Sequence, residues 1–181
     1  MIRSHRTIFI VLYILVGQLL PAQSTLFVPK SFIILDSASG DFNKDAYTDL
    51  LIILKYENED AFSDSIRPLL LLAGTADDSY ALMLRNDSVV LCAGCGGALG
   101  DPFQGITTKS GEFSIEYYGG SAWRWTRTTT FRYDASSSDH ILQKDGGVSF
   151  HISDPDKQED YLLNEEGWGK LSLRQYCHYK E

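Results

Sequence analysis

The sequence predicts an all-β domain, mainly antiparallel, folded as a single sandwich or open barrel of about eight to ten short strands. Short runs rich in leucine, β-branched or aromatic residues recur along the chain, and Gly, Asn, Asp, Ser or Pro bound each of them. No run has the length and period of a long amphipathic helix. The chain of 181 residues, 44% of them hydrophobic, is long enough for one domain with a buried core.

The first part of the chain supplies most of the expected strands. Residues 50–54 and 69–72 are continuously apolar, which predicts strands that are covered on both faces. The expected strands span residues 31–36, 50–56, 69–73, 80–84, 88–92 and 112–118.

Alternation marks the next strand, at residues 123–133. Its odd-numbered positions place two tryptophans, Phe131 and Tyr133 on one face, and threonines with Arg132 lie on the other. A turn is expected at 134–139, followed by a hairpin of residues 140–144 and 148–152 across Asp145-Gly146-Gly147. Residues 153–167 are polar and are expected to form a loop, and residues 168–177 a last strand.

The N-terminus reads as an export signal. In residues 1–24, Arg3 and Arg6 precede an apolar stretch, and the small residues Ala22 and Ser24 follow it. We expect cleavage after Ala22 or after Ser24, and export to the periplasm or the extracellular medium. The apolar stretch is shorter than the roughly 20 residues that span a membrane, so no stable span is expected after signal removal.

The remaining residues, 25–181, are expected to form a single β-rich domain with a strong negative charge. The chain has 24 acidic and 16 basic residues; loss of Arg3 and Arg6 leaves 14 basic residues and a formal charge of −10. This charge repels phosphate backbones and argues against a nucleic-acid partner. It also suits a protein that binds a hard cation. The sequence leaves the oligomeric state open.

Three cysteines give an odd count, Cys92, Cys95 and Cys177. In an exported protein we predict a Cys92–Cys95 disulfide, with Cys177 free or paired between chains. The rival pairing joins Cys177 to Cys92 or Cys95. A redox Cys-x-x-Cys pair belongs at a helix N-terminus after a strand, whereas a glycine-rich loop is expected here. Zinc is excluded because no second pair of cysteines exists.

Oxygen-bearing side chains recur at alternate positions in residues 41–49. Asp41, Asn43 and Asp45 lie at the spacing of a chain that curls around Ca²⁺, with Asp49 as a fourth ligand and the Tyr47 carbonyl where a backbone oxygen contributes. The segment is not an EF-hand, because a strand residue stands where that loop has its bidentate glutamate. A metal-free, Asx-rich turn that caps a strand is the alternative.

The run from Gly40 to Leu50, with the hydrophobic strand after it, resembles the calcium loop of FG-GAP and VCBS-type units. The resemblance implies Ca²⁺ ligands at Asp41, Asn43, Asp45, the Tyr47 carbonyl and Asp49. Ala46 departs from the glycine usual at its position. Residues 36–134 also resemble a pattern in exported bacterial proteins, through a glycine-rich turn, a Gly-Asp-Pro-Phe step and a Tyr-Gly-Gly-Ser-x-Trp-Arg-Trp strand. That second resemblance implies one exported β domain and no particular activity.

Aromatic residues between positions 117 and 125 form a candidate ligand surface. Their rings could stack on sugar rings while an arginine bonds hydroxyl or carboxylate groups. The alternative places Trp123 and Trp125 in the core. The candidate surface comprises Tyr117, Tyr118, Trp123, Arg124 and Trp125.

These features predict a secreted, non-enzymatic β domain with a structural Ca²⁺ loop that presents a surface to a protein or glycan. The alternative is a small, exported, glycan-directed hydrolase that uses carboxylates and His140 or His151. No Gly-x-Ser-x-Gly elbow is present in the sequence. A pocket that joins a histidine to two carboxylates would favour the enzyme, and an exposed aromatic patch would favour binding.

Overall fold

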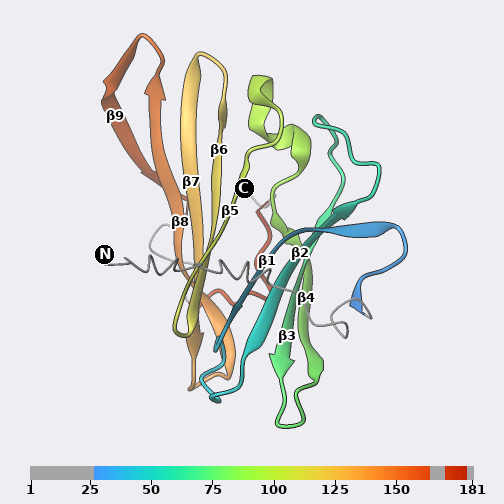
Figure 1. Ribbon diagram of the computed structural model, residues 1–181. Coiled ribbons are helices and arrows are strands. Elements are labelled where there is room, and N and C mark those ends of the chain that lie inside the picture. Colours follow the sequence, from blue (N-terminus) through green and yellow to red (C-terminus); the bar gives the residue numbers. More distant parts are fainter. Residues whose placement is uncertain (1–26, 164–169, 179–181) are drawn as a thin grey trace, which may run out of the picture.

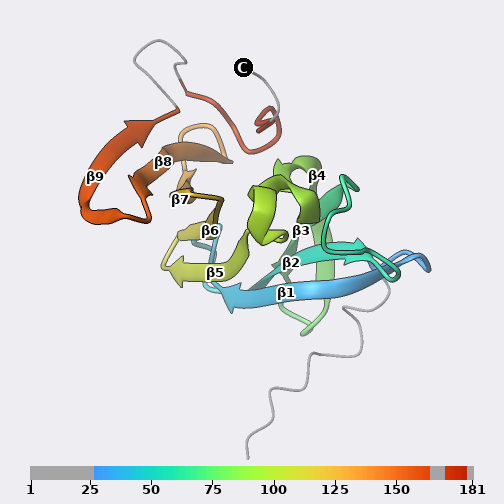
Figure 2. The same ribbon diagram turned by 90° about the horizontal axis from the view of Figure 1, so that it is seen from above.

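A computed structural model describes residues 27–163 and 170–178, so the expected signal at 1–24 lies outside the described residues. The described strands form two antiparallel sheets, one in the order β1-β2-β3-β4 and the other β5-β6-β7-β8-β9 (Figures 1 and 2). This confirms the prediction of a mainly antiparallel all-β fold of about eight to ten strands; the two sheets are consistent with the sandwich, and they do not close into a barrel. The strands are β1 Phe32–Gly40, β2 Asp49–Tyr56, β3 Arg67–Gly74, β4 Tyr80–Val90, β5 Phe103–Lys109, β6 Glu112–Gly120, β7 Trp123–Asp134, β8 Asp139–His151 and β9 Asp154–Leu162.

The main core lies between the two sheets. Leu51 and Leu71 of the first sheet and Phe113 and Phe131 of the second belong to one buried cluster. Alternate residues of β2 and β3 point to the other face of the first sheet, where Ile52 and its neighbours form a second buried cluster. The prediction that these two apolar strands are covered on both faces is therefore confirmed.

The structure of the middle segment differs from the prediction in three places. The two short strands expected at 80–84 and 88–92 belong to one strand, β4, because the pairing with β3 continues through Asn86. The polar side chain of Asn86 is accommodated there because its amide donates to the carbonyls of Leu173 and Tyr176 at 2.6 and 2.9 Å. A short 3-10 helix, η2 (Ala93–Leu99), follows β4 where a glycine-rich loop was expected. Strand β5 was not expected, because its mixed sequence FQGITTK has no clear alternation.

The expected hairpin across Asp145-Gly146-Gly147 is wrong. The segment continues as the single long strand β8, with β7 and β9 on its two sides. A Cβ at Gly147 would overlap the carbonyl oxygen of Thr126, and one at Gly146 would overlap that of Tyr161. The glycines therefore permit close approach of neighbouring strands and do not form a turn.

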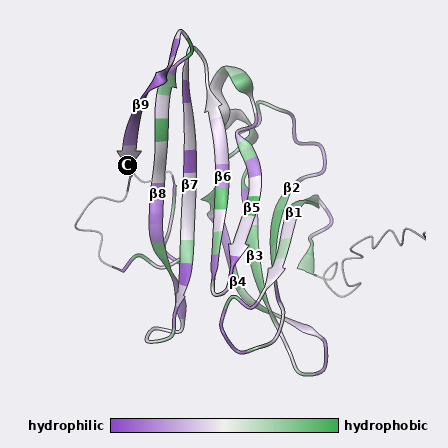
Figure 3. Cartoon of the chain, turned by 60° about the vertical axis from the view of Figure 1, so that its left-hand side comes forward, coloured by the Kyte–Doolittle hydropathy of each residue, from purple (hydrophilic) through white to green (hydrophobic). Residues whose placement is uncertain are grey.

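The expected polar loop at 153–167 is also wrong where the structure describes it. Residues Asp154–Leu162 form β9, which pairs with β8 and is exposed along most of its length. Figure 3 shows that this strand is largely hydrophilic. A strand that buries little side-chain surface gives no hydrophobic period, and its backbone pairing decides its conformation.

The C-terminal tail packs against the core rather than forming a full strand. Its described residues, 170–178, make one isolated bridge, between Ser172 and Ile141, where a strand over 168–177 was expected. Leu173 and Tyr176 are buried in the main core. The Tyr176 hydroxyl donates to Asp145 at 2.6 Å, and Arg127 bonds both oxygens of that buried carboxylate at 2.6 and 2.8 Å.

A buried histidine, His140, and a partly buried one, His178, make stability depend on pH. Burial lowers the pKa of His140, and burial also lowers that of His178 from the ordinary 6.5 to about 4. The charged form therefore favours the unfolded chain, so stability is complete above pH 6.5 and is lost as the pH falls toward 4.

We expect the melting temperature to fall between pH 7 and pH 5. Removing the two titrating rings should remove most of that fall, while an amide keeps each hydrogen bond. The measurement compares wild type with the double variant His140→Gln, His178→Asn by thermal melting at both pH values. An equal fall in both proteins would contradict the assignment.

Candidate functional site

Residues 41–49 connect β1 to β2 and tie the two sheets together at one end of the molecule (Figure 1). Phe42 is fully buried in the main core. Its carbonyl accepts a hydrogen bond from Nε2 of His140 on β8 at 3.0 Å, which fixes the tautomer of that ring. The carbonyl of Asp41 accepts from the backbone N–H of Gly111, between β5 and β6, at 3.0 Å.

The side chains of this loop curl around its own backbone. Oxygens of Asp41 and Asn43 both accept from the N–H of Asp45, at 3.1 and 3.0 Å, and Asp45 accepts from the N–H of Tyr47 at 2.9 Å. Ala46 has a φ of 72°. It thus adopts the conformation that favours glycine, the residue usual there in the resembled calcium loops, despite its Cβ. The loop brings Asp41, Asn43 and Asp45 together, as the spacing predicts.

Asp49 is buried, unlike the other acidic residues of the loop, Asp41 and Asp45. Its fully buried carboxylate accepts three backbone N–H groups: Phe42 at 2.8 Å, Asn43 at 3.1 Å and Gly74 at 3.0 Å. Burial raises the pKa of this carboxyl group, and the three N–H donors oppose that rise. Asp49 is therefore a brace that holds both ends of the loop and the end of β3, rather than a side chain turned toward a ligand.

The oxygen atoms of the 41–49 loop are of a kind that could bind a hard cation. Within residues 27–163 and 170–178, no three His, Cys, Asp or Glu side chains form a group that could hold a metal ion. Asn43 contributes an amide rather than a carboxylate to the loop, and the carboxylate of Asp49 is turned to backbone donors. Carboxylate, amide and carbonyl oxygens from Asp41, Asn43, Asp45 and Tyr47 are of the chemical type that Ca²⁺ prefers.

The expected aromatic surface is divided between two faces of its sheet. Tyr117 is only 2% exposed and belongs to the main core, so its expected place on a ligand surface is corrected. Trp125 packs partly buried against the same core. Tyr118 and Arg124 point to the opposite face. Each is the direct neighbour of Tyr117 or Trp125 in its strand, and successive side chains of a strand alternate between faces. Trp123 is 56% exposed and packs edge-on against His151.

The predicted disulfide is confirmed, and Cys177 is a free cysteine. Cys92 and Cys95 have a Cα–Cα distance of 5.1 Å, and Cys92 caps the start of η2. The motif therefore does stand between a strand and a helix, contrary to the expected loop. Its first cysteine is buried, with an exposed fraction of 5%.

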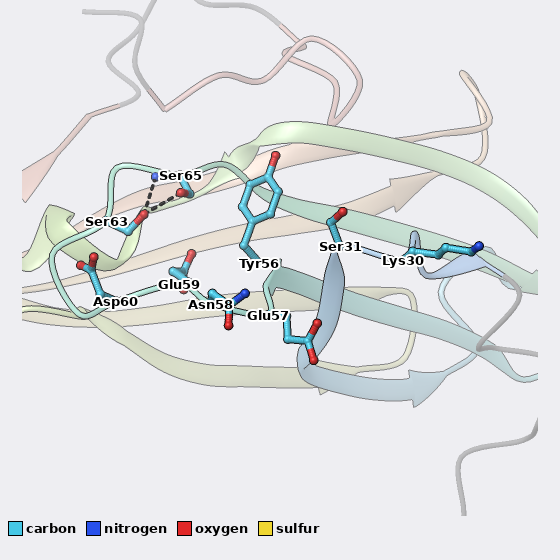
Figure 4. Close-up of a pocket in the computed structure, with 9 residues that line it drawn as sticks. All are labelled: Lys30, Ser31, Tyr56, Glu57, Asn58, Glu59, Asp60, Ser63 and Ser65. Carbon is cyan, nitrogen blue, oxygen red and sulfur yellow. Dashed lines mark hydrogen bonds between the residues drawn. The ribbon is translucent and has the colours of Figure 1, made fainter.

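Of the pockets lined by described residues, three concave sites have no histidine among their lining residues. The largest of these three, of about 590 Å³, lies beside the segment between β2 and β3 (Figure 4). Its Glu59 is already bonded to the buried Arg67. A second, of about 420 Å³, is bounded by the 41–49 loop and the β3–β4 turn. Of the histidines expected for a hydrolase, His140 bonds a loop carbonyl and His151 bonds Ser153.

A buried charge cluster was missed by sequence reasoning. Arg67, fully buried, bonds Glu59 and also both carboxylate oxygens of Asp101, at 2.8 and 2.6 Å. Its position directly before an apolar run was the available signal, because an arginine there needs partners when the strand is buried.

Comparison of the chain with protein-family models, with curated proteins and with solved structures gives no match. The described part of the chain has no helix of sufficient length and apolar character to cross a membrane.

Proposed function

We propose that this chain is an exported, non-enzymatic β domain whose 41–49 loop binds Ca²⁺ as a structural ion, and that the domain presents a surface to a protein or glycan. The observation that carries the proposal is the position of the loop. It joins two strands of the first sheet and is bonded to the second sheet through Gly111 and His140, and its oxygen-bearing side chains gather at one point of the chain.

The loop's charge supports a cation. Asp41 and Asp45 both bond the short backbone segment 45–47, so two negative charges are held close together. A divalent cation would relieve their repulsion and use oxygens that now accept backbone N–H groups. In this proposal Asp41, Asn43, Asp45 and the Tyr47 carbonyl hold the ion, and Asp49 keeps the loop in place.

Trp123 supports the binding role. It is the most exposed of the five expected surface residues and is the first residue of β7. The end of the molecule where β7 begins lies opposite the connection between β1 and β2 (Figure 1). A large aromatic side chain left in solvent at the end of a strand suits contact with a protein or glycan.

Calorimetric titration of the mature protein tests the ion directly. We expect one Ca²⁺ per chain with a Kd of about 10⁻⁴ M, in the range of extracellular calcium modules, and weaker binding of Mg²⁺. Asp45→Ala should weaken binding at least about tenfold, because it removes a ligand. Asp156→Ala, which removes the same charge from the exposed strand β9, is the matched control and should bind as the wild type does. Absence of saturable binding, or an equal loss in both variants, would overturn the proposal.

A further inference from the structure

The pocket between the 41–49 loop and the β3–β4 turn has walls that are locked to each other. Asp49 accepts the N–H of Gly74 at 3.0 Å, and a Cβ at Gly74 would overlap the carbonyl oxygen of Thr48. The pocket therefore has fixed walls, and its volume of about 420 Å³ lies toward the lower end of the roughly 300–1,000 Å³ typical of small-ligand sites.

Two tyrosines supply aromatic surface to this pocket. Tyr47 lines it and is 45% exposed, although its backbone N–H is held by Asp45 at 2.9 Å. Tyr80 also lines it and packs partly buried against the outer apolar cluster of the first sheet. The Tyr80 ring is thus packed against the fold, whereas the backbone of Tyr47 is held in place and part of its side chain stays open to solvent. Tyrosine rings of this kind combine an apolar face with a hydroxyl group.

Hydroxyl and carboxylate groups complete the lining. Thr75 donates its hydroxyl to Asp77 at 2.5 Å, and Ser79 donates to the same oxygen at 2.8 Å. These two hydroxyl groups hold the pKa of Asp77 below its usual value, so it stays ionised at neutral pH. Asp78, with a φ of 58°, lies at the turn and lines the pocket itself. The described lining therefore offers oriented hydroxyls and one carboxylate.

The charge of the lining selects the class of ligand. No lysine or arginine is among the lining residues that the structure describes, and Asp78 repels anions. Phosphates and acidic sugars are thereby disfavoured. A neutral sugar has both the apolar ring face that stacks on tyrosine and the hydroxyls that bond threonine, serine and aspartate.

We infer that this pocket binds a neutral saccharide of one or two rings. The inference rests on the proposed function for the view of this chain as a binding domain, and it names the glycan class and the place. Because Tyr47 and Thr48 belong to the same loop as Asp41 and Asp45, an ion in the loop would fix one wall of the saccharide site.

NMR titration of the mature protein with named sugars tests the inference. The probes are glucose, galactose, mannose and N-acetylglucosamine, with cellobiose, lactose and chitobiose as two-ring forms. We expect at least one of these to shift the amide signals of Tyr47, Thr75 and Tyr80 in a saturable way. Tyr47→Ala should weaken that binding about fivefold or more through loss of ring contact. Phe62→Ala is the matched control: it removes a 71% exposed aromatic ring from the β2–β3 segment and should leave sugar binding unchanged.

Each titration is run with calcium and with a chelator, and with tetramethylammonium and inorganic phosphate as charged probes. Saturable sugar binding that depends on Tyr47 supports the site, even where calcium itself fails to bind. No shift at these residues with any sugar overturns it, even where calcium binds as proposed. Binding of either charged probe in place of a sugar, or equal effects of Tyr47→Ala and Phe62→Ala, also overturns it.

Discussion

Arg67→Met should lower the free energy of unfolding by about 3–5 kcal/mol, the largest single effect that we expect. The side chain of Arg67 is 1% exposed, that of Glu59 is 2% exposed and that of Asp101 is 35% exposed. Removing the guanidinium leaves two carboxylates facing each other with little solvent around the first. Denaturant unfolding of the purified variant measures the loss.

The surface pair Arg85–Asp87 provides the matched control. Its side chains are 40% and 41% exposed, so Arg85→Met should cost less than about 1 kcal/mol. The triple variant Arg67→Met, Glu59→Gln, Asp101→Asn should be more stable than Arg67→Met alone, because no unpaired charge remains. Similar losses for Arg67→Met and Arg85→Met would contradict the assigned role of the cluster.

Asp49→Asn should destabilise the fold by about 3 kcal/mol. The carboxylate accepts three backbone N–H groups, whereas an amide has a single acceptor oxygen and directs its own N–H atoms at the remaining donors. Denaturant unfolding in the presence of a chelator measures this loss without any contribution from an ion.

Hydrogen exchange gives a second readout for Asp49→Asn. The amides of Phe42, Asn43 and Gly74 should exchange faster than in the wild type, because they lose their acceptor. Asp60→Asn is the control, since the exposed Asp60 carboxylate accepts the single N–H of Phe62, and its cost should stay within about 1 kcal/mol. Unchanged exchange at all three amides would show that Asp49 is not the brace.

Strands with an apolar signal were predictable from the sequence, and strands held by pairing alone were not. The runs at β2 and β3 are continuously apolar because each faces a buried cluster on both sides. Strand β9 carries charges on both faces and is held by its pairing with β8, so its sequence resembles a loop. The glycines of β8 resemble a turn, although their cause is the backbone of β7 and β9 beside them.

The candidate site was predictable only where its chemistry is local. Alternate oxygens in residues 41–49 act on neighbouring backbone groups, so their spacing is visible in the sequence. The bracing role of Asp49 depends on Gly74, and the pocket proposed to bind a saccharide depends on a turn from a different part of the chain. Such long-range contacts arise from strand pairing, which the sequence does not display. The split of Tyr117 and Tyr118 is different, because it follows from the alternation of neighbouring side chains along β6, a local pattern that the sequence does display.

Thermal melting in calcium and in chelator tests the central claim, that an ion in the 41–49 loop stabilises this fold. An ion present at a hundred times its Kd adds about 2.7 kcal/mol, which corresponds to a rise of about 5–10 °C for a domain of this size. We expect this rise in the wild type and in Asp156→Ala, and its near-complete loss in Asp45→Ala. Equal melting temperatures in calcium and in chelator, with Asp45→Ala matching the wild type, would contradict the account.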